Sequence, residues 1–525
     1  MKKVFGLNVL FVSLLFLLAT SSIDAQTRKF TNVRKISMNG VQEIKKNDVI
    51  IGYYAYFFIE KKDRKNYTFQ LDIMDSKLKT THKVSFTKPK RSVLLEMKFN
   101  GSHFCFTYLD VKKRNLTSTL YDMQGKKTGT NVIDDLERRS IAVLMQQLEM
   151  KDGYYSGTLI PIDEKGFAVV YPKKEKGLKA KIDMFDNNGK KLWTTDSGET
   201  KKSWEMFSPM YSSGDYLVGV INSRPGMMSK KLTETVYIFD TKNGHVAGKA
   251  ATKTPKAYYT INGVDYDKER NEFFMFGSKY GINGKRVNFK TSIGLFMNYF
   301  KPDGSITERK MAFWGKDIMK KVKGKDKAKV KKGASIMLHS MVRTNTGKFV
   351  AVGELYNKEA DALGIAAKML SSNSNTSVAK IVLYNMLVLE FDKDFKTKQV
   401  MVVEKPKQNR TLPSGALLYS EGALGYFLKS YGMFDFEFFS TNSDRSRFST
   451  VYKSYNRGKK GRDGNRYTVG VIAMDDEGEM VSQKISLNSK PTWFSVLPSK
   501  PGYVGVFEYF RKGRKAGIRI EKIDL

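Results

Sequence analysis

Short runs of apolar, β-branched and aromatic residues alternate with polar turns along almost the whole chain. Many of these runs end in Asp, continue into a turn rich in Asp, Asn, Gly and Lys, and are followed by a second apolar run. Examples are Phe69–Asp75, Ile182–Trp193, Val236–Gly244 and Ile472–Gly478. Because Asp and Asn bond their own backbone in turns and Gly adopts positive φ, each copy predicts a β-hairpin.

A second pattern, a turn followed by an aromatic-rich strand, precedes most of these hairpins, as at Gly166–Tyr171 and Lys348–Gly353. A further short strand lies upstream, as at Thr158–Ile162. Together they predict a four-stranded unit that recurs about every 67 residues, against about 40 to 50 in regular propeller repeats. The preserved order of the patterns favours a β-propeller over unrelated hairpins, and the extra length predicts inserted loops.

The two ends of the chain complement each other. Trp493–Leu525 has material for three strands only, and Lys29–Ser37 offers a spare strand. In a propeller, a strand from one terminus can complete the last blade and remove an exposed sheet edge. We therefore predict an all-β protein, a β-propeller of eight four-stranded blades, with seven as the alternative. The N-terminal strand is expected to pair with the C-terminal blade, and short helical insertions are expected between strands.

We predict one propeller domain, residues 26–525, behind a signal peptide at residues 1–25. Lys2 and Lys3 precede the apolar run Val9–Ala19, which is shorter than the roughly 20 residues of a membrane-spanning helix. The mature chain is thus expected to be an exported monomer without a transmembrane segment, in the periplasm or outside the outer membrane. Insertions are predicted near 131–150, 314–335, 355–380 and 440–466, with helices at Asp134–Met150 and Leu355–Leu370.

The hairpin Ile182–Trp193 resembles the strand–Asp–turn–Gly-Lys-Leu-Trp hairpins of PQQ-like β-propeller repeats, and the repeats as a whole resemble those of PQQ-like or WD-type propellers. Eight-bladed relatives of that kind include quinoprotein dehydrogenases and outer-membrane assembly scaffolds. The dehydrogenases need a vicinal disulfide, and a chain whose single cysteine is Cys105 cannot form one. The resemblance therefore does not imply that activity. The predicted signal ends in Asp24-Ala25-Gln26, which looks like exported proteins of the Bacteroidetes type.

The chain is strongly basic, with 91 Lys and Arg against 53 Asp and Glu and a formal charge of +38. Two charge runs, Lys316–Lys332 and Arg457–Arg466, are candidate contacts for a polyanion, although a solvated face or a flexible loop is the favoured explanation. The candidate side chains are Lys320, Lys321, Lys323, Lys325, Lys327, Lys329, Lys331, Lys332, Arg457, Lys459, Lys460 and Arg462. No aromatic residues interleave the first run, which disfavours nucleic acid as a partner. The expected partner is an envelope protein, or an anionic polysaccharide or lipid surface.

Candidate chemistry is sparse. No phosphate-binding loop, nucleophile elbow or zinc-protease motif is present, and neither a cofactor nor a metal site is predicted. Strand alternation in Phe434–Phe439 would place Asp435 and Glu437 on one face about 7 Å apart, where they could hold a cation or act as an acid–base pair. The alternative is an ordinary half-buried strand. His339 lies in a candidate innermost strand, where it could line the central channel; the alternative, which the sequence favours, is an ordinary core or rim histidine.

From these patterns we predict an exported, non-catalytic β-propeller that acts as a binding or scaffolding protein of the bacterial cell envelope. Two alternatives stay open. One is a basic module that binds anionic glycan or lipid, and the other is a carbohydrate-active hydrolase or lyase with its site over the central channel. Convergence of Asp435, Glu437 or His339 in the structure would favour the enzyme.

Overall fold

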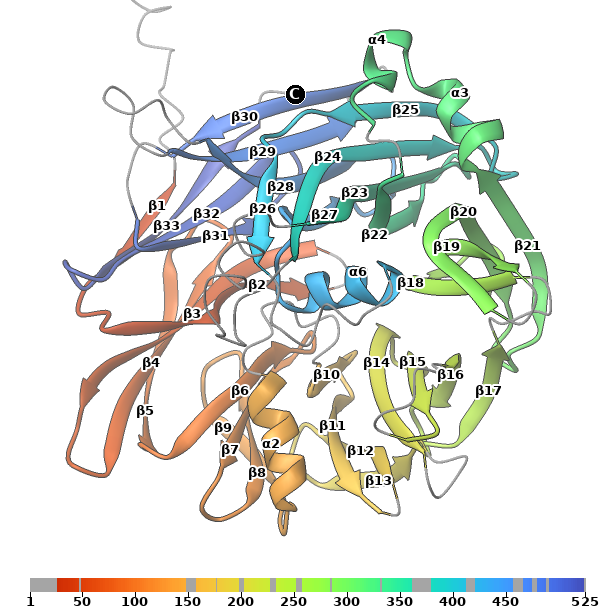
Figure 1. The fold of residues 1–525 in the computed structure, drawn as a ribbon. Helices are drawn as coiled ribbons and strands as arrows, with labels where there is room; N and C mark the ends of the chain where they lie inside the picture. Colours follow the sequence, from red (N-terminus) through yellow and green to blue (C-terminus); the bar gives the residue numbers. More distant parts are fainter. Residues whose placement is uncertain are drawn as a thin grey trace, which may run out of the picture.

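The computed structural model describes residues 26–46, 49–147, 157–175, 177–197, 203–226, 233–251, 257–283, 286–330, 333–360, 379–411, 421–456, 466–474, 479–487 and 491–523. The predicted signal peptide lies outside these residues. Largely antiparallel sheets, most of them four-stranded, are arranged around a common centre, which is the architecture of the predicted all-β propeller (Figure 1).

Taken in chain order, the described strands form successive groups of four, which we number blades 1 to 8; the strands of blades 3 and 4 belong to one sheet of eight, because Leu178 and Trp204 pair in parallel. Blade 1 contains β2 (Lys35–Lys46), β3 (Val49–Lys61), β4 (Asn66–Asp75) and β5 (Thr80–Pro89). Blade 2 contains β6 (Ser92–Phe99), β7 (His103–Asp110), β8 (Asn115–Asp122) and β9 (Lys127–Ile133). Blade 3 contains β10 (Leu159–Ile162), β11 (Gly166–Lys174), β12 (Leu178–Asp186) and β13 (Lys191–Asp196). Blade 4 contains β14 (Trp204–Ser212), β15 (Tyr216–Arg224), β16 (Thr233–Asp240) and β17 (Val246–Ala251).

The second half of the ring repeats this plan. Blade 5 contains β18 (Ala257–Asp267), β19 (Glu272–Asn283), β20 (Arg286–Phe300) and β21 (Ile306–Phe313). Blade 6 contains β22 (Ser335–Arg343), β23 (Phe349–Ala360), β24 (Ala379–Phe391) and β25 (Thr397–Val403), and the short β26 (Gln408–Thr411) also pairs with β24. Blade 7 contains β27 (Phe436–Thr441), β28 (Phe448–Asn456), β29 (Arg466–Met474) and β30 (Met480–Ser486). Blade 8 contains β31 (Trp493–Pro498), β32 (Tyr503–Phe510), β33 (Lys515–Lys522) and β1 (Thr27–Phe30).

The N-terminal strand completes the last blade. β1 pairs antiparallel with β33, in register from Thr27 opposite Arg519 to Phe30 opposite Ala516. The strand predicted at Lys29–Ser37 is divided between β1 and β2, because the chain turns between them at Asn32, whose φ is 59°. The expected pairing partner is therefore present, although the boundary of the strand was misplaced.

Every pair of neighbouring blades shares a buried apolar cluster. Tyr54 of blade 1 packs with Phe104 of blade 2, for example, and Val451 of blade 7 belongs to one cluster with Val506 of blade 8. Blades 8 and 1 are joined in the same way, so the ring has no unpacked gap within the described residues. Burial between blades, rather than within one central core, stabilises the molecule, since about 25 cal/mol is gained for each Å² of apolar surface removed from water.

The predicted hairpin turns connect the third and fourth strands of most blades. Asp75, Asp122, Asp186 and Asp392 each accept hydrogen bonds from the backbone N–H groups two and four residues further on. This Asp-turn explains why the sequence pattern ends its third strand in Asp.

The insertions are partly helical. Helix α2 (Arg138–Gln147) lies within Asp134–Met150 and buries Leu144 between blades 2 and 3. The predicted helix Leu355–Leu370 is wrong for residues 355–360, which continue β23, and its remainder lies outside the described residues. Helix α6 (Glu421–Ser430) lies inside the ring of blades beside β18 (Figure 1). Within the described part of the chain, no helix is both long and apolar enough to cross a membrane.

Candidate active site

The first strands of the blades form the inner ring, and most of them carry a β-bulge. Neighbouring first strands contact one another, as β14 contacts β18 and β27 contacts β31. In five of the described first strands, the register shifts by one residue, which leaves an extra residue in the strand. The extra residues are Leu95, Met210, Asn262, His339 and Glu437. Bulges redirect side chains and are common beside active sites.

Two predicted site residues therefore occupy equivalent positions. His339 is the extra residue of β22 and Glu437 is that of β27, in the adjacent blade. The ring of His339 stacks on Phe436 with a centroid distance of 4.5 Å and meets Phe434 edge-on at 4.8 Å. His339 is thus clamped between two aromatic residues of the strand that was predicted to carry the acid–base pair.

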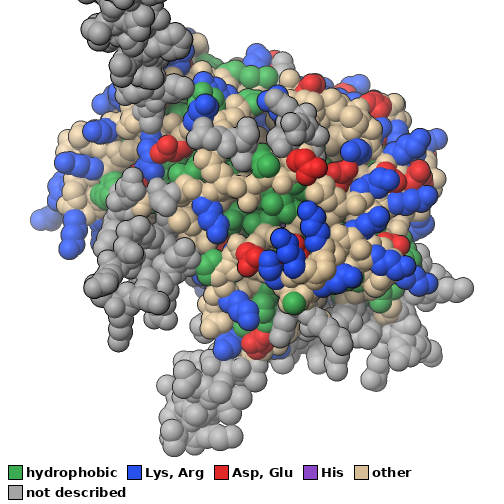
Figure 2. All heavy atoms as spheres, turned by 90° about the horizontal axis from the view of Figure 1, so that it is seen from above, with side chains coloured by type: hydrophobic (Ala, Val, Ile, Leu, Met, Phe, Trp, Pro, Cys, Tyr) green, Lys and Arg blue, Asp and Glu red, His purple; other side chains and the backbone are tan. Residues whose placement is uncertain are grey.

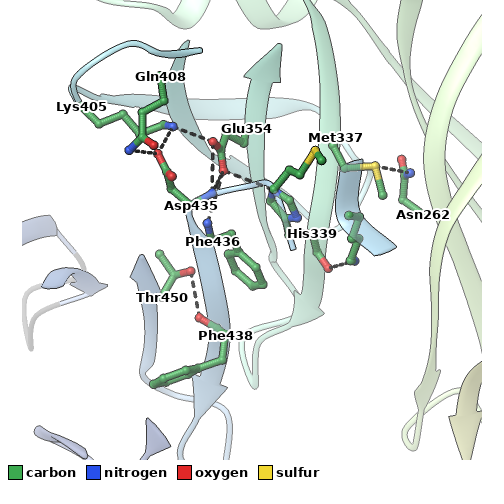
Figure 3. A network of polar contacts seen from close by, with 12 residues as sticks. Asn262, Met337, His339, Glu354, Lys405, Gln408, Asp435, Phe436, Phe438 and Thr450 are labelled. Carbon is green, nitrogen blue, oxygen red and sulfur yellow. Dashed lines mark hydrogen bonds and ion pairs between the residues drawn. The ribbon is translucent and has the colours of Figure 1, made fainter. Parts of the chain in front are cut away.

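A buried ionic cluster lies next to this histidine (Figure 3). Glu354 comes from β23, Lys405 follows β25, and Asp435 directly precedes β27. The ammonium group of Lys405 donates to Glu354 Oε1 at 2.6 Å and to Asp435 Oδ2 at 2.5 Å. The side chains of Glu354 and Lys405 are fully buried, and that of Asp435 is 3% exposed.

Each carboxylate of the ionic cluster has further donors. The backbone N–H groups of Asp435 and Phe436 donate to Glu354 Oε2 at 3.0 and 3.3 Å, which ties blade 6 to the start of blade 7. His339 Nε2 lies 3.7 Å from the same oxygen. Arg410 of β26 contacts Asp435 Oδ1 at 3.1 Å, and its side chain is 35% exposed. The Arg410 guanidinium therefore connects the buried carboxylate with solvent.

The two carboxylates have opposite electrostatic environments. Burial alone would raise the pKa of Glu354, but Lys405 and His339 beside it lower that pKa to about 2. Burial and the negative charge of Glu354 raise the pKa of Asp435 to about 6, against the attraction of Lys405 and Arg410. Burial opposes the charge on Lys405, but the two carboxylates raise its pKa above the usual value. Carboxyl groups whose pKa values are driven apart in this way are typical of acid–base sites, although structural ion clusters perturb pKa values too.

The third predicted residue does not join the cluster. Glu437 Oε1 pairs with Lys453 at 2.8 Å, on the neighbouring strand β28. Because Asp435 precedes β27 and Glu437 occupies the bulge, simple alternation does not relate the two carboxylates. The expected Asp435–Glu437 pair is therefore wrong, and the partner of Asp435 is Glu354. The sequence offered one signal for Glu354, an acid within the apolar run Phe349–Tyr356, and none for Lys405 or Arg410.

A second buried ion pair provides a comparison. Lys179 of β12 donates to Glu205 of β14 at 2.7 Å, and both side chains are at most 3% exposed. Hydroxyl groups of Ser197 and Ser203 also donate to Glu205. This pair joins blades 3 and 4 and includes a single carboxylate.

The predicted polyanion contacts are only partly described. Residues 314–327 include η1 (Trp314–Ile318), α3 (Met319–Lys321) and α4 (Gly324–Lys327). The exposed candidates in this segment are Lys320, Lys321, Lys323, Lys325 and Lys327. Lys329 instead pairs with Asp326 and Glu404. Lys331, Lys332, Arg457, Lys459, Lys460 and Arg462 lie outside the described residues. On the face seen in Figure 2, Lys and Arg side chains are spread among acidic ones rather than gathered in one patch.

Cys105 is buried on β7, and burial raises the pKa of its thiol far above the usual value, which makes it a poor nucleophile. Among the described residues, no group of three or more His, Cys, Asp or Glu side chains is arranged to hold a metal ion.

Comparison with solved structures returns distant matches. The tricorn protease is 10% identical, with 87% of this chain and 36% of that chain covered and a TM-score of 0.34. A prolyl endopeptidase is 12% identical, with 88% of this chain and 54% of that chain covered and a TM-score of 0.32. The β-propeller domain of the Trilobed protease from Pyrococcus furiosus is 12% identical, with 70% of this chain and 96% of that chain covered and a TM-score of 0.26. The chain thus spans about a third to a half of the first two proteins.

These matches contradict the prediction of a non-catalytic binding or scaffolding protein, because several of the solved structures returned are peptidases. An apocarotenoid oxygenase from Synechocystis also matches, at 8% identity and a TM-score of 0.29, with 90% of this chain and 95% of that chain covered. At such identities and TM-scores, none of these activities carries over to this chain.

No curated protein matches the sequence. A family model described as a family of unknown function, DUF6770, matches residues 2–524. The chain therefore belongs to the DUF6770 family.

Proposed function

We propose that the protein is an exported enzyme that cleaves an anionic polysaccharide by acid–base catalysis at the ionic cluster of blade 6. The observation that carries the proposal is the pair of carboxylates on Lys405, of which Glu354 has its pKa lowered to about 2 and Asp435 has its pKa raised to about 6. An acid whose pKa is raised toward neutral pH, beside a group that stays ionised, meets the requirement of general acid catalysis.

In this proposal Asp435 is the general acid. Glu354 is a positioning residue: its charge keeps the proton on Asp435, and its contacts with the backbone of β27 fix the carboxyl group in place. Arg410 reaches solvent and would bind a carboxylate of the substrate, as guanidinium groups do in two-pronged contacts. Entry of substrate along Arg410 would weaken its contact with Asp435 and raise the pKa of that acid further.

The substrate class follows from charge. A chain with a formal charge of +38 attracts polyanions over its whole surface, which raises their local concentration at any site it carries. Export to the periplasm or cell surface, the PQQ-like character of the hairpins and an origin among Bacteroidetes-type proteins remain predictions from the sequence. Among envelope polymers, acidic polysaccharides combine the required charge with bonds that acid catalysis cleaves.

The test uses the mature chain, residues 26–525, and a panel of acidic polysaccharides that includes polygalacturonate and hyaluronate. New reducing ends measure hydrolysis, and ultraviolet absorbance of unsaturated products measures elimination. We expect cleavage of at least one polymer and a rate that falls as pH rises through about 6, because Asp435 then loses its proton. Asp435→Asn should lower that rate by at least a hundredfold.

The matched control is Glu205→Gln, which alters an equally buried Lys–Glu pair in blades 3 and 4. It should destabilise the protein without changing the pH profile of cleavage. If no polymer of the panel is cleaved, or if Asp435→Asn and Glu205→Gln lower activity equally, the ionic cluster is only structural and the proposal is wrong.

A further inference from the structure

The lysine-rich segment between blades 5 and 6 is anchored by buried apolar side chains. This basic segment, residues 314–330, follows β21 and includes η1, α3 and α4. Ile318 and Val322 belong to the apolar cluster that blades 5 and 6 share, with 0% and 3% of their surface exposed. Val322 also forms a parallel bridge with Val400 of β25, which places the segment along the outer edge of blade 6 (Figure 1). The segment is therefore a fixed part of the fold and not the flexible loop that its composition favoured.

The acidic groups of the basic segment are already engaged. Asp317 accepts a hydrogen bond from the backbone N–H of Phe313 at 2.8 Å. Asp326 binds Lys329 at 2.8 Å, and Lys329 also contacts Glu404, the residue after β25. Seven Lys against two Asp give residues 314–330 a net charge of +5. Six of these seven lysines are exposed, namely Lys316, Lys320, Lys321, Lys323, Lys325 and Lys327.

The loop after β25 connects the basic segment with the ionic cluster. Glu404 contacts Lys329 of the segment, and the next residue, Lys405, holds the two carboxylates of the cluster. The side chain of Asn385 strengthens this link. Its amide group donates to Lys329 O at 3.1 Å, and its carbonyl oxygen accepts from the backbone N–H of Lys405 at 3.3 Å. The basic segment and the proposed site thus share one support on β24.

Arg410 lies further along the same edge of β24. Both β25 and β26 pair with β24, on the side that faces away from β23. Arg410 pairs with Ile381, four residues before Asn385, which corresponds to about 13 Å of strand. In Figure 1, β26 lies closer to the centre of the ring than α3 and α4. Cationic groups therefore lie at the outer edge of blade 6 and again beside Asp435, at a spacing that a polymer of several sugars can bridge.

We infer that the basic segment is an outer binding surface for the anionic polysaccharide, and that the polymer extends from its exposed lysines to Arg410. The identity of the polymer rests on the proposed function. The large apolar side chains of the segment, Trp314 among them, pack against blades 5 and 6 and are not presented to a lipid bilayer. Charge is therefore what the segment offers to a partner, and an acidic polymer can engage several of these charges at once.

Two consequences distinguish an extended surface from a single anion site. A polymer that neutralises several lysines releases the ions around them, so its affinity falls steeply as salt rises. A trimer that reaches only Arg410 engages one guanidinium group, so its affinity falls less. Loss of the lysines should likewise weaken binding of the polymer and leave binding of the trimer unchanged.

Isothermal titration calorimetry with long-chain polygalacturonate and with trigalacturonate tests the inference. The titrations use the mature chain with Asp435→Asn, which prevents cleavage during the measurement. The test variant adds four substitutions, Lys320→Gln, Lys321→Gln, Lys323→Gln and Lys325→Gln. The control variant instead removes four exposed charges near the β3–β4 and β7–β8 turns, by Lys61→Gln, Lys62→Gln, Lys112→Gln and Lys113→Gln. Melting temperatures show that both variants are folded.

The test variant should raise the Kd of the polymer at least tenfold at low salt and leave that of the trimer unchanged, whereas the control variant should change neither by more than twofold. Equal losses in both variants would reduce the lysines to general surface charge and overturn the inference. The inference is equally wrong if the polymer does not bind, or if the Kd of the trimer rises as much as that of the polymer.

Vesicles that contain phosphatidylglycerol are the further arm. If the test variant loses vesicle binding but keeps polymer binding, the segment contacts membranes and the inference is wrong. Cleavage by the unsubstituted mature chain is measured separately. If the polymer binds through the lysines but is not cleaved, the proposed cleavage fails and the binding surface stands.

Discussion

Replacing Lys405 by Met would test the energetics of the ionic cluster directly. The substitution keeps the length of the side chain but leaves Glu354 and Asp435 buried without their shared counter-ion, at contacts of 2.6 and 2.5 Å in the wild type. Removing one partner of a buried pair typically costs about 3 to 5 kcal/mol, because an uncompensated charge stays behind. Here two carboxylates are left, and we expect a loss at the upper end of that range, near pH 7.

The pH dependence of this loss is the sharper part of the prediction. Without the ammonium group, the pKa of both carboxyl groups rises, so protonation removes the uncompensated charges as pH falls. The difference in unfolding free energy between wild type and Lys405→Met should therefore be largest near pH 7 and should shrink toward pH 4. Urea unfolding followed by tryptophan fluorescence measures it, with Lys179→Met as the matched control that leaves one carboxylate. A loss below about 1 kcal/mol, or one independent of pH, would refute a charged, buried Lys405.

Three further predictions concern other parts of the fold. Burial raises the pKa of Glu234 from 4.5 to about 8 in the folded protein. Because the unfolded chain gives up this proton more easily, the free energy of unfolding should fall by about 5 kcal/mol as pH rises from 4.5 to 8. The variant Glu234→Gln should flatten this part of the curve of stability against pH. Cys105 should react with a thiol reagent only at the rate of unfolding, and fast labelling of the native protein would contradict its burial. A chain that begins after residue 30 lacks β1 and should melt at a clearly lower temperature, because β33 becomes an open edge; an unchanged melting temperature would argue against closure by this strand.

Local chemistry explains which parts of the fold could be predicted. The Asp-turns were visible because one residue type, as at Asp186, makes its contacts within four residues of sequence. The bulge at Glu437 was not visible, since it depends on how β27 pairs with β28, and it removes the alternation on which the Asp435–Glu437 pair was based. The helix predicted after Leu355 failed because pairing with β24 extends β23 through a segment whose composition suits either structure.

Long-range contacts determine the ionic cluster, and this is why the sequence revealed only part of it. Asp435 and His339 were recognised as unusual polar residues in apolar strands, yet their common partner Glu354 lies 81 residues from Asp435. Lys405 enters from the loop after β25 and has no motif around it. Only the packing of blade 6 against blade 7 brings the side chains of His339, Glu354, Lys405 and Asp435 together.

The two buried lysines differ in their surroundings, and this difference supports the proposed catalytic role of the ionic cluster. Lys179 donates to the Glu205 carboxylate and to the Ser203 hydroxyl group, and Ser197 also donates to Glu205, which is sufficient to join two blades. Lys405 holds two carboxylates, and joining the blades would require only Glu354, which already binds the backbone of β27. The second carboxylate, Asp435, adds electrostatic repulsion and connects to solvent through Arg410. This repulsion opposes folding, and its place at the inner ring beside the bulged His339 is the reason why we propose chemistry at Asp435.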